Sequence, residues 1–320
     1  MPGAEKALMP VEKVEVLIVV DNYVDLLLAS DERIKRPALA RDGRISQKTL
    51  LAEHGLCLLI RSFAAGRSHA LLMDTSYNPG TAAHNLSLLQ EDLAGVDTLV
   101  MSHGHLDHAG GLAALKALAP GLRRLVMHPD GALRRYQDHP QAGLLSYPDP
   151  LTPENTAKLG LEFVPNIAPM LFADGAMLLS GPVPRRTAFE KLSSGRLIER
   201  GGGLEPDEII DDQSLFLDLA GKGLVVISGC AHAGIINTVR WGQKLTGQQK
   251  VHAVIGGFHL SGTAMAPVVG PTVEELKAIS PEVVMPMHCT GMTAIAEIAK
   301  ALPKAFVLSS AGSRLVLTGK

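Results

Sequence analysis

The sequence has few cysteines, no long apolar run and no excess of charge of either sign. Its three cysteines, Cys57, Cys230 and Cys289, are an odd and widely spaced set that does not make a disulfide framework, so we expect a reducing compartment. No run approaches the ~18 uninterrupted apolar residues of a membrane span. The segment from Met1 to Lys13 also lacks the apolar core of a signal peptide. We therefore expect a cytoplasmic protein.

The charge balance excludes one class of partner. Thirty Lys and Arg against 32 Asp and Glu give a formal net charge of −2, without a basic run that would attract nucleic acid. We expect a small-molecule substrate, no nucleic acid and no membrane, and leave a homo-oligomer open. The chain is 46% hydrophobic and 19% charged, which is typical of a globular protein with a large core. Its 320 residues would by length alone suggest two domains of roughly 100–200 residues.

Four candidate metal donors follow the β-branched run Val96–Val100 and precede a helix-like segment, Leu112–Leu118. They are His103, His105, Asp107 and His108. Imidazole nitrogen and carboxylate oxygen bind zinc-like cations at roughly 2.0–2.2 Å. In an extended loop, residues two apart point the same way, so His103 and His105 can share one ion. Asp107 and His108 can reach a second ion from the tight turn. A His-rich surface loop is the alternative, but donors this dense between glycines favour a metal site.

This His-x-His-x-Asp-His motif after a strand resembles the signature of the metallo-β-lactamase superfamily. From Asp21-Asn22 to Cys289, the chain resembles one branch of it, the dihydropterin ribofuranosylaminobenzene phosphate synthases of archaeal methanopterin biosynthesis. The resemblance implies an α/β (α+β) fold, a four-layer αββα sandwich with two mixed sheets face to face and metals at one edge. We predict one domain over residues 1–320, with insertions near 29–50, 138–160 and 182–211.

Two later strands also end in candidate donors. Gly223–Gly229 runs into Cys230-Ala231-His232, and Val283–Met287 runs into His288. The resemblance implies that His288 is the last ligand and that Cys230 or His232 is another; we favour His232. Many superfamily members have a histidine near Asp211-Asp212, and this chain has none, so both carboxylates stay open as alternatives. The expected ligands are therefore His103, His105 and His232 for one ion, and Asp107, His108 and His288 for the other.

The resemblance also implies a role for Asp74, which ends the strand that begins at Ala70, as a residue that supports the ligands without binding the metal. Its carboxylate would hydrogen-bond the His-rich loop and fix ligand orientation, whereas the alternative is a surface turn. Asn22 follows the first strand, Val14–Val20, and either faces the substrate or caps a turn.

Three further side chains are candidates for contact with the substrate. Arg185 or Arg186 would bind a phosphate or carboxylate, unless the two form a solvated surface pair. His259 follows Gly256-Gly257, which allows close backbone approach. We consider His259 either a catalytic residue that contacts substrate or stabilises developing charge, or an ordinary core histidine.

The expected activity is hydrolysis with two divalent metal ions, zinc first, with manganese or iron as alternatives. Two ions roughly 3.5–4 Å apart lower the pKa of a shared water toward ~7. Asp107 would also orient this nucleophile, and the substrate would be a small anionic phosphoester or lactone. One alternative is the pterin-condensing activity of the branch, with loss of pyrophosphate as an aryl amine adds to a pterin methylene. Another is a mono-iron dioxygenase.

Overall fold

A computed structural model describes residues 8–41, 43–192 and 195–320. The other residues are 1–7, 42, 193 and 194. The first seven belong to the N-terminal segment in which we expect no signal peptide. Residue 42 belongs to the predicted insertion 29–50, and residues 193 and 194 belong to the insertion 182–211. Those parts of the predictions lie outside the described residues.

The first sheet has eight strands, and β-branched residues and leucine fill the strands at its centre, which are largely buried. In spatial order they are β12 (Glu162–Pro165), β9 (Arg124–Met127), β8 (Val96–Val100), β7 (Arg67–Met73), β6 (Cys57–Ala64), β2 (Lys13–Val20), β21 (Arg314–Thr318) and β3 (Ile34–Lys35). Strands β6 to β9 are joined by antiparallel and then parallel pairing, so the sheet is mixed.

The second sheet has seven strands and is also mixed. Its main path is β13 (Met170–Phe172), β14 (Met177–Leu179), β17 (Ser214–Leu219), β18 (Gly223–Ser228), β19 (Val251–Gly257) and β20 (Val283–Met287), and β1 (Pro10–Val11) pairs with β17. The strands β18, β19 and β20 are parallel neighbours. Their carboxyl ends therefore lie side by side at one edge of the sheet.

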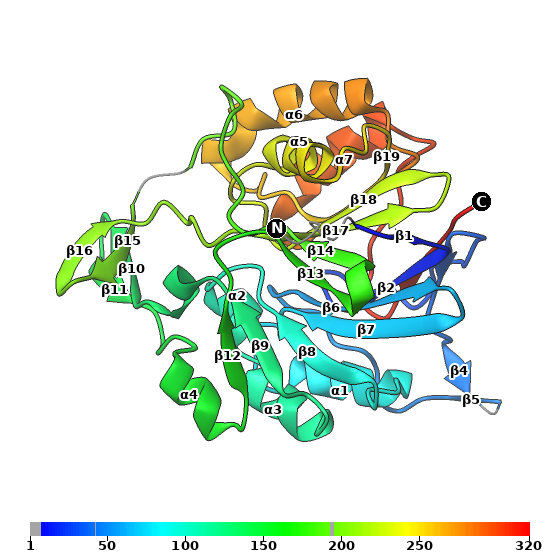
Figure 1. Cartoon of the computed structure of the whole chain (residues 1–320), viewed down its shortest axis with the longest axis horizontal. Coiled ribbons are helices and arrows are strands. Elements are labelled where there is room, and N and C mark those ends of the chain that lie inside the picture. The colour runs from blue at the N-terminus through cyan, green and yellow to red at the C-terminus, as the bar shows by residue number, and fades with distance from the viewer. Residues whose placement is uncertain (1–7, 42, 193–194) are drawn as a thin grey trace, which may run out of the picture.

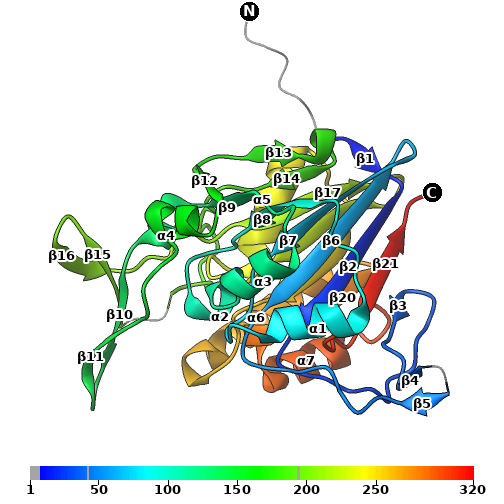
Figure 2. The same ribbon diagram turned by 90° about the horizontal axis from the view of Figure 1, so that it is seen from below.

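Helices cover the outer faces of the two sheets, as Figures 1 and 2 show. On the second sheet lie α5 (Ile235–Thr246), α6 (Ala266–Ile279) and α7 (Met292–Ala301); on the first lie α1 (Thr81–Leu89) and α3 (Leu112–Leu118). Three apolar clusters fill the spaces, one between the sheets and one between each sheet and its helices. This arrangement confirms the predicted αββα sandwich of two mixed sheets.

A small four-stranded sheet stands apart from the sandwich, at the left of Figures 1 and 2. This side sheet consists, in order, of β11 (Gly143–Ser146), β10 (Arg135–His139), β15 (Arg196–Arg200) and β16 (Gly203–Pro206). The segments predicted as insertions near 138–160 and 182–211 supply most of these strands. The strands β10 and β11 form one hairpin and β15 and β16 form another, and the two hairpins are joined by the pairing of β10 with β15. The segment 138–160 also contains a short helix, α4 (Pro153–Lys158).

The other described elements are short. They are the paired strands β4 (Ala40–Arg41) and β5 (Arg44–Ile45), the helix α2 (Leu106–Ala109) and four 3₁₀ turns at Pro129–Ala132, Ala173–Gly175, Thr263–Met265 and His288–Thr290. Helix α1 ends at Leu89, where Gln90 takes a left-handed conformation (φ 56°). Within the described ranges, no helix has the length and apolar character needed to cross a bilayer.

Candidate metal centre

The candidate donors lie at one edge of the sandwich, where the carboxyl ends of strands from both sheets meet. Strand β8 ends at Val100, just before the His-rich loop His103–His108, and α2 begins within that loop. From the other sheet, β18 leads to Cys230 and β20 leads to His288. Two sheets packed face to face therefore bring donors more than 100 residues apart in the chain into one cluster.

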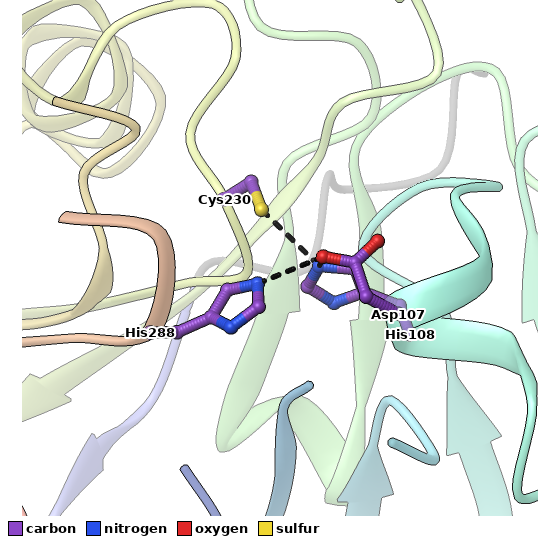
Figure 3. A group of neighbouring side chains, drawn as sticks. All are labelled: Asp107, His108, Cys230 and His288. Atoms are coloured by element: carbon purple, nitrogen blue, oxygen red, sulfur yellow. Dashed lines mark hydrogen bonds and ion pairs between the residues drawn. The ribbon is translucent and has the colours of Figure 1, made fainter. Parts of the chain in front are cut away.

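One group of donors consists of Asp107, His108, Cys230 and His288, which we call the Asp107 set (Figure 3). One ligand atom from each lies within 4.8 Å of the others. His108 Nε2 is 3.1 Å from Cys230 Sγ, and His288 Nε2 is 3.1 Å from Asp107 Oδ2. All four ligand atoms thus face one small volume, although they come from three different segments.

The outer hydrogen bonds of these two rings fix which nitrogen faces the centre. His108 Nδ1 lies 2.7 Å from Asp74 Oδ2, and because a carboxylate only accepts, the ring must donate its Nδ1–H. His288 Nδ1 lies 3.1 Å from Asn22 Oδ1, which likewise only accepts. In the neutral form of each ring the lone pair on Nε2 then faces inward, which is the tautomer that metal-ligating histidines require.

A second group consists of His103, Cys230 and His232, which we call the His103 set. The Ser102 hydroxyl donates to Asp74 Oδ2 (2.8 Å) and accepts from His103 Nδ1–H (2.9 Å), so His103 Nε2 also faces inward. His103 Nε2 and His232 Nε2 are only 3.2 Å apart and both are buried. Two facing lone pairs at this distance are unfavourable unless a proton or a cation lies between them.

Asp74 holds the His-rich loop at three points. Its carboxylate accepts from the Ser102 N–H (2.7 Å), from the Ser102 hydroxyl and from His108 Nδ1–H. The side chain is completely buried at the end of β7. This geometry is that of a residue that orients ligands.

His105 lies beside the His103 set without joining either group of converging donor atoms. Its ring centroid is 4.5 Å from that of His103 and 4.8 Å from that of His232, in both cases edge to face. On its other side the ring stacks on Tyr147, with centroids 6.4 Å apart. The structure thus places His105 in contact with His103 and His232, and its predicted role as a ligand stays a prediction.

Burial keeps most of these imidazoles neutral. Desolvation lowers the pKa of His103, His105 and His232 well below the ordinary value. Burial also lowers the pKa of His108, but the carboxylates of Asp74 and Asp107 outweigh it and raise this pKa well above the ordinary value. In the metal-free protein a proton on His108 thus balances the charge of Asp107. Metal binding to these residues would displace that proton.

The backbone is strained around the same edge. Asp74, Ala231, His259 and His288 have left-handed φ angles of 62°, 54°, 46° and 51°, respectively. Such conformations cost of order 1–3 kcal/mol each for a non-glycine residue and persist where surrounding contacts enforce them. Here they direct side chains at strand ends toward the cluster.

These observations fit a metal ion. The donors are neutral imidazole, carboxylate and thiol, the set that zinc and neighbouring transition metals prefer. Buried His232 Nδ1 and His259 Nδ1 have no hydrogen-bond partner among the described residues. The inward-facing His288 Nε2 likewise accepts no hydrogen bond from the described residues. The His/Cys/Asp clusters are therefore of the kind that binds metal.

The acidic alternatives to His232 lie outside both sets. Asp211 accepts from Arg135 Nη2 and from the Gly104 N–H, each at 2.8 Å. Asp212 accepts from the Ala233 N–H at 2.8 Å, and burial raises its pKa to about 7. Arg185 lies further out again, half-buried near Asp212, with its Nη2 3.5 Å from the Ile209 carbonyl. Arg186 is exposed.

His259 lies next to the His103 set, at the mouth of a pocket. Its ring centroid is 4.1 Å from that of His232. The pocket has a volume of about 10 Å³, room for about one water, and is lined by Glu190, Lys191, Leu192, Ala231, His232, Gly234, Phe258, His259, Leu260, Met265 and Val268. Its walls are mainly apolar, and Lys191 supplies a positive charge.

Three residues near the cluster had no role in the sequence predictions. His54, from the patternless loop before β6, has its Nε2 3.7 Å from Asp107 Oδ2 and its ring 5.0 Å from that of His288. Asp21 accepts from the His288 N–H at 2.8 Å. Arg135 lies behind the His-rich loop. The Asp-Asn pair after the first strand was a usable signal for Asp21, whereas nothing local in the sequence marks His54 or Arg135.

Comparisons with known proteins agree with this architecture. The family model described as the metallo-beta-lactamase superfamily matches residues 51–203. A 7,8-dihydropterin-6-methyl-4-(beta-D-ribofuranosyl)-aminobenzene-5'-phosphate synthase of Methanocaldococcus jannaschii is 29% identical over 265 residues, 82% of this chain and 90% of that protein. An uncharacterized protein of the same organism is 31% identical over 255 residues, 79% of this chain and 90% of the other.

Among solved structures, one similar protein is Tm1679, described as a metal-dependent hydrolase of the beta-lactamase superfamily. The similarity covers 95% of this chain and 99% of that one, with a TM-score of 0.68 and 23% identity. At this identity the similarity shows the shared fold.

Proposed function

The chain belongs to the metallo-β-lactamase superfamily, and we propose that it is a dinuclear metallohydrolase acting on a small anionic phosphoester or lactone. The observation that carries this proposal is the junction of the two donor sets at Cys230. Two sets that share one residue suit two neighbouring ions better than one.

We assign His103, His105 and His232 to one ion, and Asp107, His108 and His288 to the other, with Cys230 between them. His105 joins the first group because its ring contacts both of the other histidines. We expect both ions to be zinc. Two bound divalent ions would lower the pKa of a water toward ~7 and would stabilise negative charge on a substrate oxygen.

The protein's own residues position this chemistry. Asp107 Oδ2 lies between His288 Nε2 (3.1 Å) and His108 Nε2 (3.5 Å), so the carboxylate can hold a nucleophilic water near both rings. Asp74 and Asn22 fix the rings from outside. This role for Asn22 differs from the substrate contact expected for it. The exposed His54 ring is then better placed to meet substrate above Asp107.

Side chains beside His232 and His259 include groups that suit the substrate class. Lys191 offers a positive charge to a phosphate or carboxylate. Phe258, Leu260 and Met265 form an apolar wall around a cavity of about 10 Å³, which has room for one water but not for the substrate itself. His259 lies between this wall and the His103 set, where it can contact a substrate oxygen. Arg185 is half-buried against Asp212 and lies outside both donor sets, so it would attract a substrate anion only over a longer distance.

The test combines elemental analysis with hydrolysis of a phosphodiester and lactone panel. We expect about two zinc or manganese ions per chain in the wild type, and turnover of at least one ester. Asp107→Ala should reduce turnover by more than the roughly 10–100-fold typical of residues outside the first ligand shell. A matched control is Asp97→Ala, since Asp97 lies exposed on β8 and pairs with Arg124 at 2.9 Å.

An Asp107→Ala enzyme that keeps two ions and full turnover would refute the role of Asp107. One iron per chain, with no hydrolysis of any ester, would replace the hydrolase with a mono-iron dioxygenase.

A second candidate function is pterin condensation, favoured by the similarity to the M. jannaschii synthase over 90% of its length. This function predicts release of pyrophosphate when a dihydropterin methylene diphosphate and an aryl amine are supplied together. Release from the pterin alone would indicate hydrolysis instead.

A further inference from the structure

A third group of donors adjoins the two sets and contains two of the three thiols of the chain. The Sγ atoms of Cys230 and Cys289 and a ring nitrogen of His259 all lie within 4.8 Å of one another. Cys230 and Cys289 are buried, whereas His259 is partly exposed to the pocket. They follow β18, β20 and β19, three parallel neighbours, so the grouping is built into the sheet.

Two backbone features make room for this group. A Cβ atom at Gly257 would lie 2.8 Å from Cys289 Sγ and 2.4 Å from the Gly229 carbonyl oxygen, so only glycine leaves space for the thiol. Two residues later, His259 takes a left-handed φ of 46°, which turns its ring back over the strand end. The buried Nδ1 of this ring has no hydrogen-bond partner within the described ranges. Two thiols and a ring with an unpartnered buried nitrogen thus place three metal donors in one small volume.

We propose that Cys230, His259 and Cys289 form a thiolate-rich metal position, distinct from the His and Asp positions and sharing only Cys230 with them. Two thiolates and one imidazole select soft or borderline ions such as Zn²⁺, Co²⁺ and Cd²⁺ over Mg²⁺ or Ca²⁺. The proposal rests on the proposed function only in that Cys230 also belongs to the Asp107 and His103 sets. His259 also lines the small pocket beside the His103 set.

The test uses Co²⁺ as the probe on full-length protein stripped of metal. Cobalt held by thiolate gives a sulfur-to-cobalt charge-transfer band in the near ultraviolet whose intensity follows the number of thiolates. We expect the wild type to show the band of two thiolates, and Cys289→Ser to lose about half of it, since one of two thiolate ligands is removed. His259→Ala should weaken Co²⁺ binding in this band by roughly 10-fold or more, because one of three protein ligands is lost.

Cys57→Ser is the matched control, because Cys57 is equally buried but lies on β6 of the other sheet. It should leave the band unchanged. A Cys289→Ser band identical to that of the wild type would overturn the proposal, since Cys230 alone would then supply the thiolate. Cys289→Ala repeats the test should the serine variant fold poorly, as judged by circular dichroism.

The same titration separates this proposal from the proposed function. A two-thiolate band in a protein that hydrolyses no ester would refute the hydrolase and leave the thiolate position standing. Ester hydrolysis with the band of a single thiolate would do the reverse.

Discussion

Among single residues, Asp74 has the largest influence on the geometry of the His-rich loop. Its two carboxylate oxygens accept from the backbone and hydroxyl of Ser102 and from His108 Nδ1. The Ser102 hydroxyl then accepts from His103, so one buried carboxylate sets the tautomers of two rings in different donor sets. A change at Asp74 should therefore affect both sets together.

Asp74→Asn keeps the shape of the side chain but replaces one acceptor oxygen with a donor NH₂ group. His108 Nδ1 or the Ser102 hydroxyl then faces a donor, and the inward tautomer is no longer enforced. Loss of such an outer partner typically costs 10–100-fold in metal affinity. We expect zinc affinity to fall in that range, measured by competition with a chromophoric chelator.

The control for this variant is Asp97→Asn, on the exposed face of β8, for which we expect unchanged zinc affinity. If Asp74→Asn bound zinc as tightly as the wild type, the tautomers of His103 and His108 would be set by something other than Asp74.

Donors that are neighbours in the chain are visible in the sequence, and donors that meet only through packing are not. The loop from His103 to His108 places its groups within six residues, so its chemistry needed no knowledge of the fold. His54 reaches Asp107 from a segment without pattern, because two loops meet over the edge of the sandwich. The sequence also posed Cys230 and His232 as rivals, whereas the structure brings both into the same donor group.

At the scale of elements, the strand ends depend on glycines that allow two segments to touch. Gly229 follows β18 and immediately precedes Cys230. A Cβ atom there would lie 2.1 Å from Ser102 Oγ and 3.1 Å from Asp74 Oδ2. The end of β18 thus packs directly on the residues that orient the His-rich loop.

Gly229→Ala should separate β18 from the His-rich loop and move Cys230 away from both donor sets. Overpacking of this kind typically costs 1–3 kcal/mol in the free energy of unfolding. We expect that loss in denaturant unfolding of the metal-free protein, together with weaker zinc binding. Gly270→Ala is the control: it lies in α6 with nothing within 4 Å of the added atom, and should stabilise by up to about 1 kcal/mol. Equal behaviour of the two variants would contradict the close approach at Gly229.

Elements with a simple apolar period were predicted closely, and those formed by distant pairing were missed. The strands β2 and β8 and the helix α3 match their predicted ranges to within a residue. The side sheet was not predicted, since β10 and β15 pair across about sixty residues and neither has an apolar alternation of its own. No helix was predicted over α6, whose Gly270 and Pro271 are both unfavourable inside helices.

At the scale of the whole molecule, the side sheet and the metal edge are joined by one buried cation. Arg135, the first residue of β10, donates from Nε to Asp207 and from Nη2 to Asp211, each at 2.8 Å. Asp211 in turn accepts from the Gly104 N–H within the His-rich loop. The position of the loop therefore depends on a sheet that lies outside the αββα sandwich.

Arg135→Met should weaken this connection at both ends. It leaves Asp207 and Asp211 buried without a cation, and removing one partner of a buried ion pair typically costs 3–5 kcal/mol. We expect a loss of that size in denaturant unfolding, and weaker zinc binding because Gly104 loses a fixed acceptor. The neighbouring Arg134 pairs with Asp149 at the surface, with half of its side chain exposed. Arg134→Met should therefore change stability by no more than about 1 kcal/mol. If Arg135→Met were as stable as Arg134→Met and bound zinc normally, the side sheet would be an independent attachment rather than a support for the metal edge.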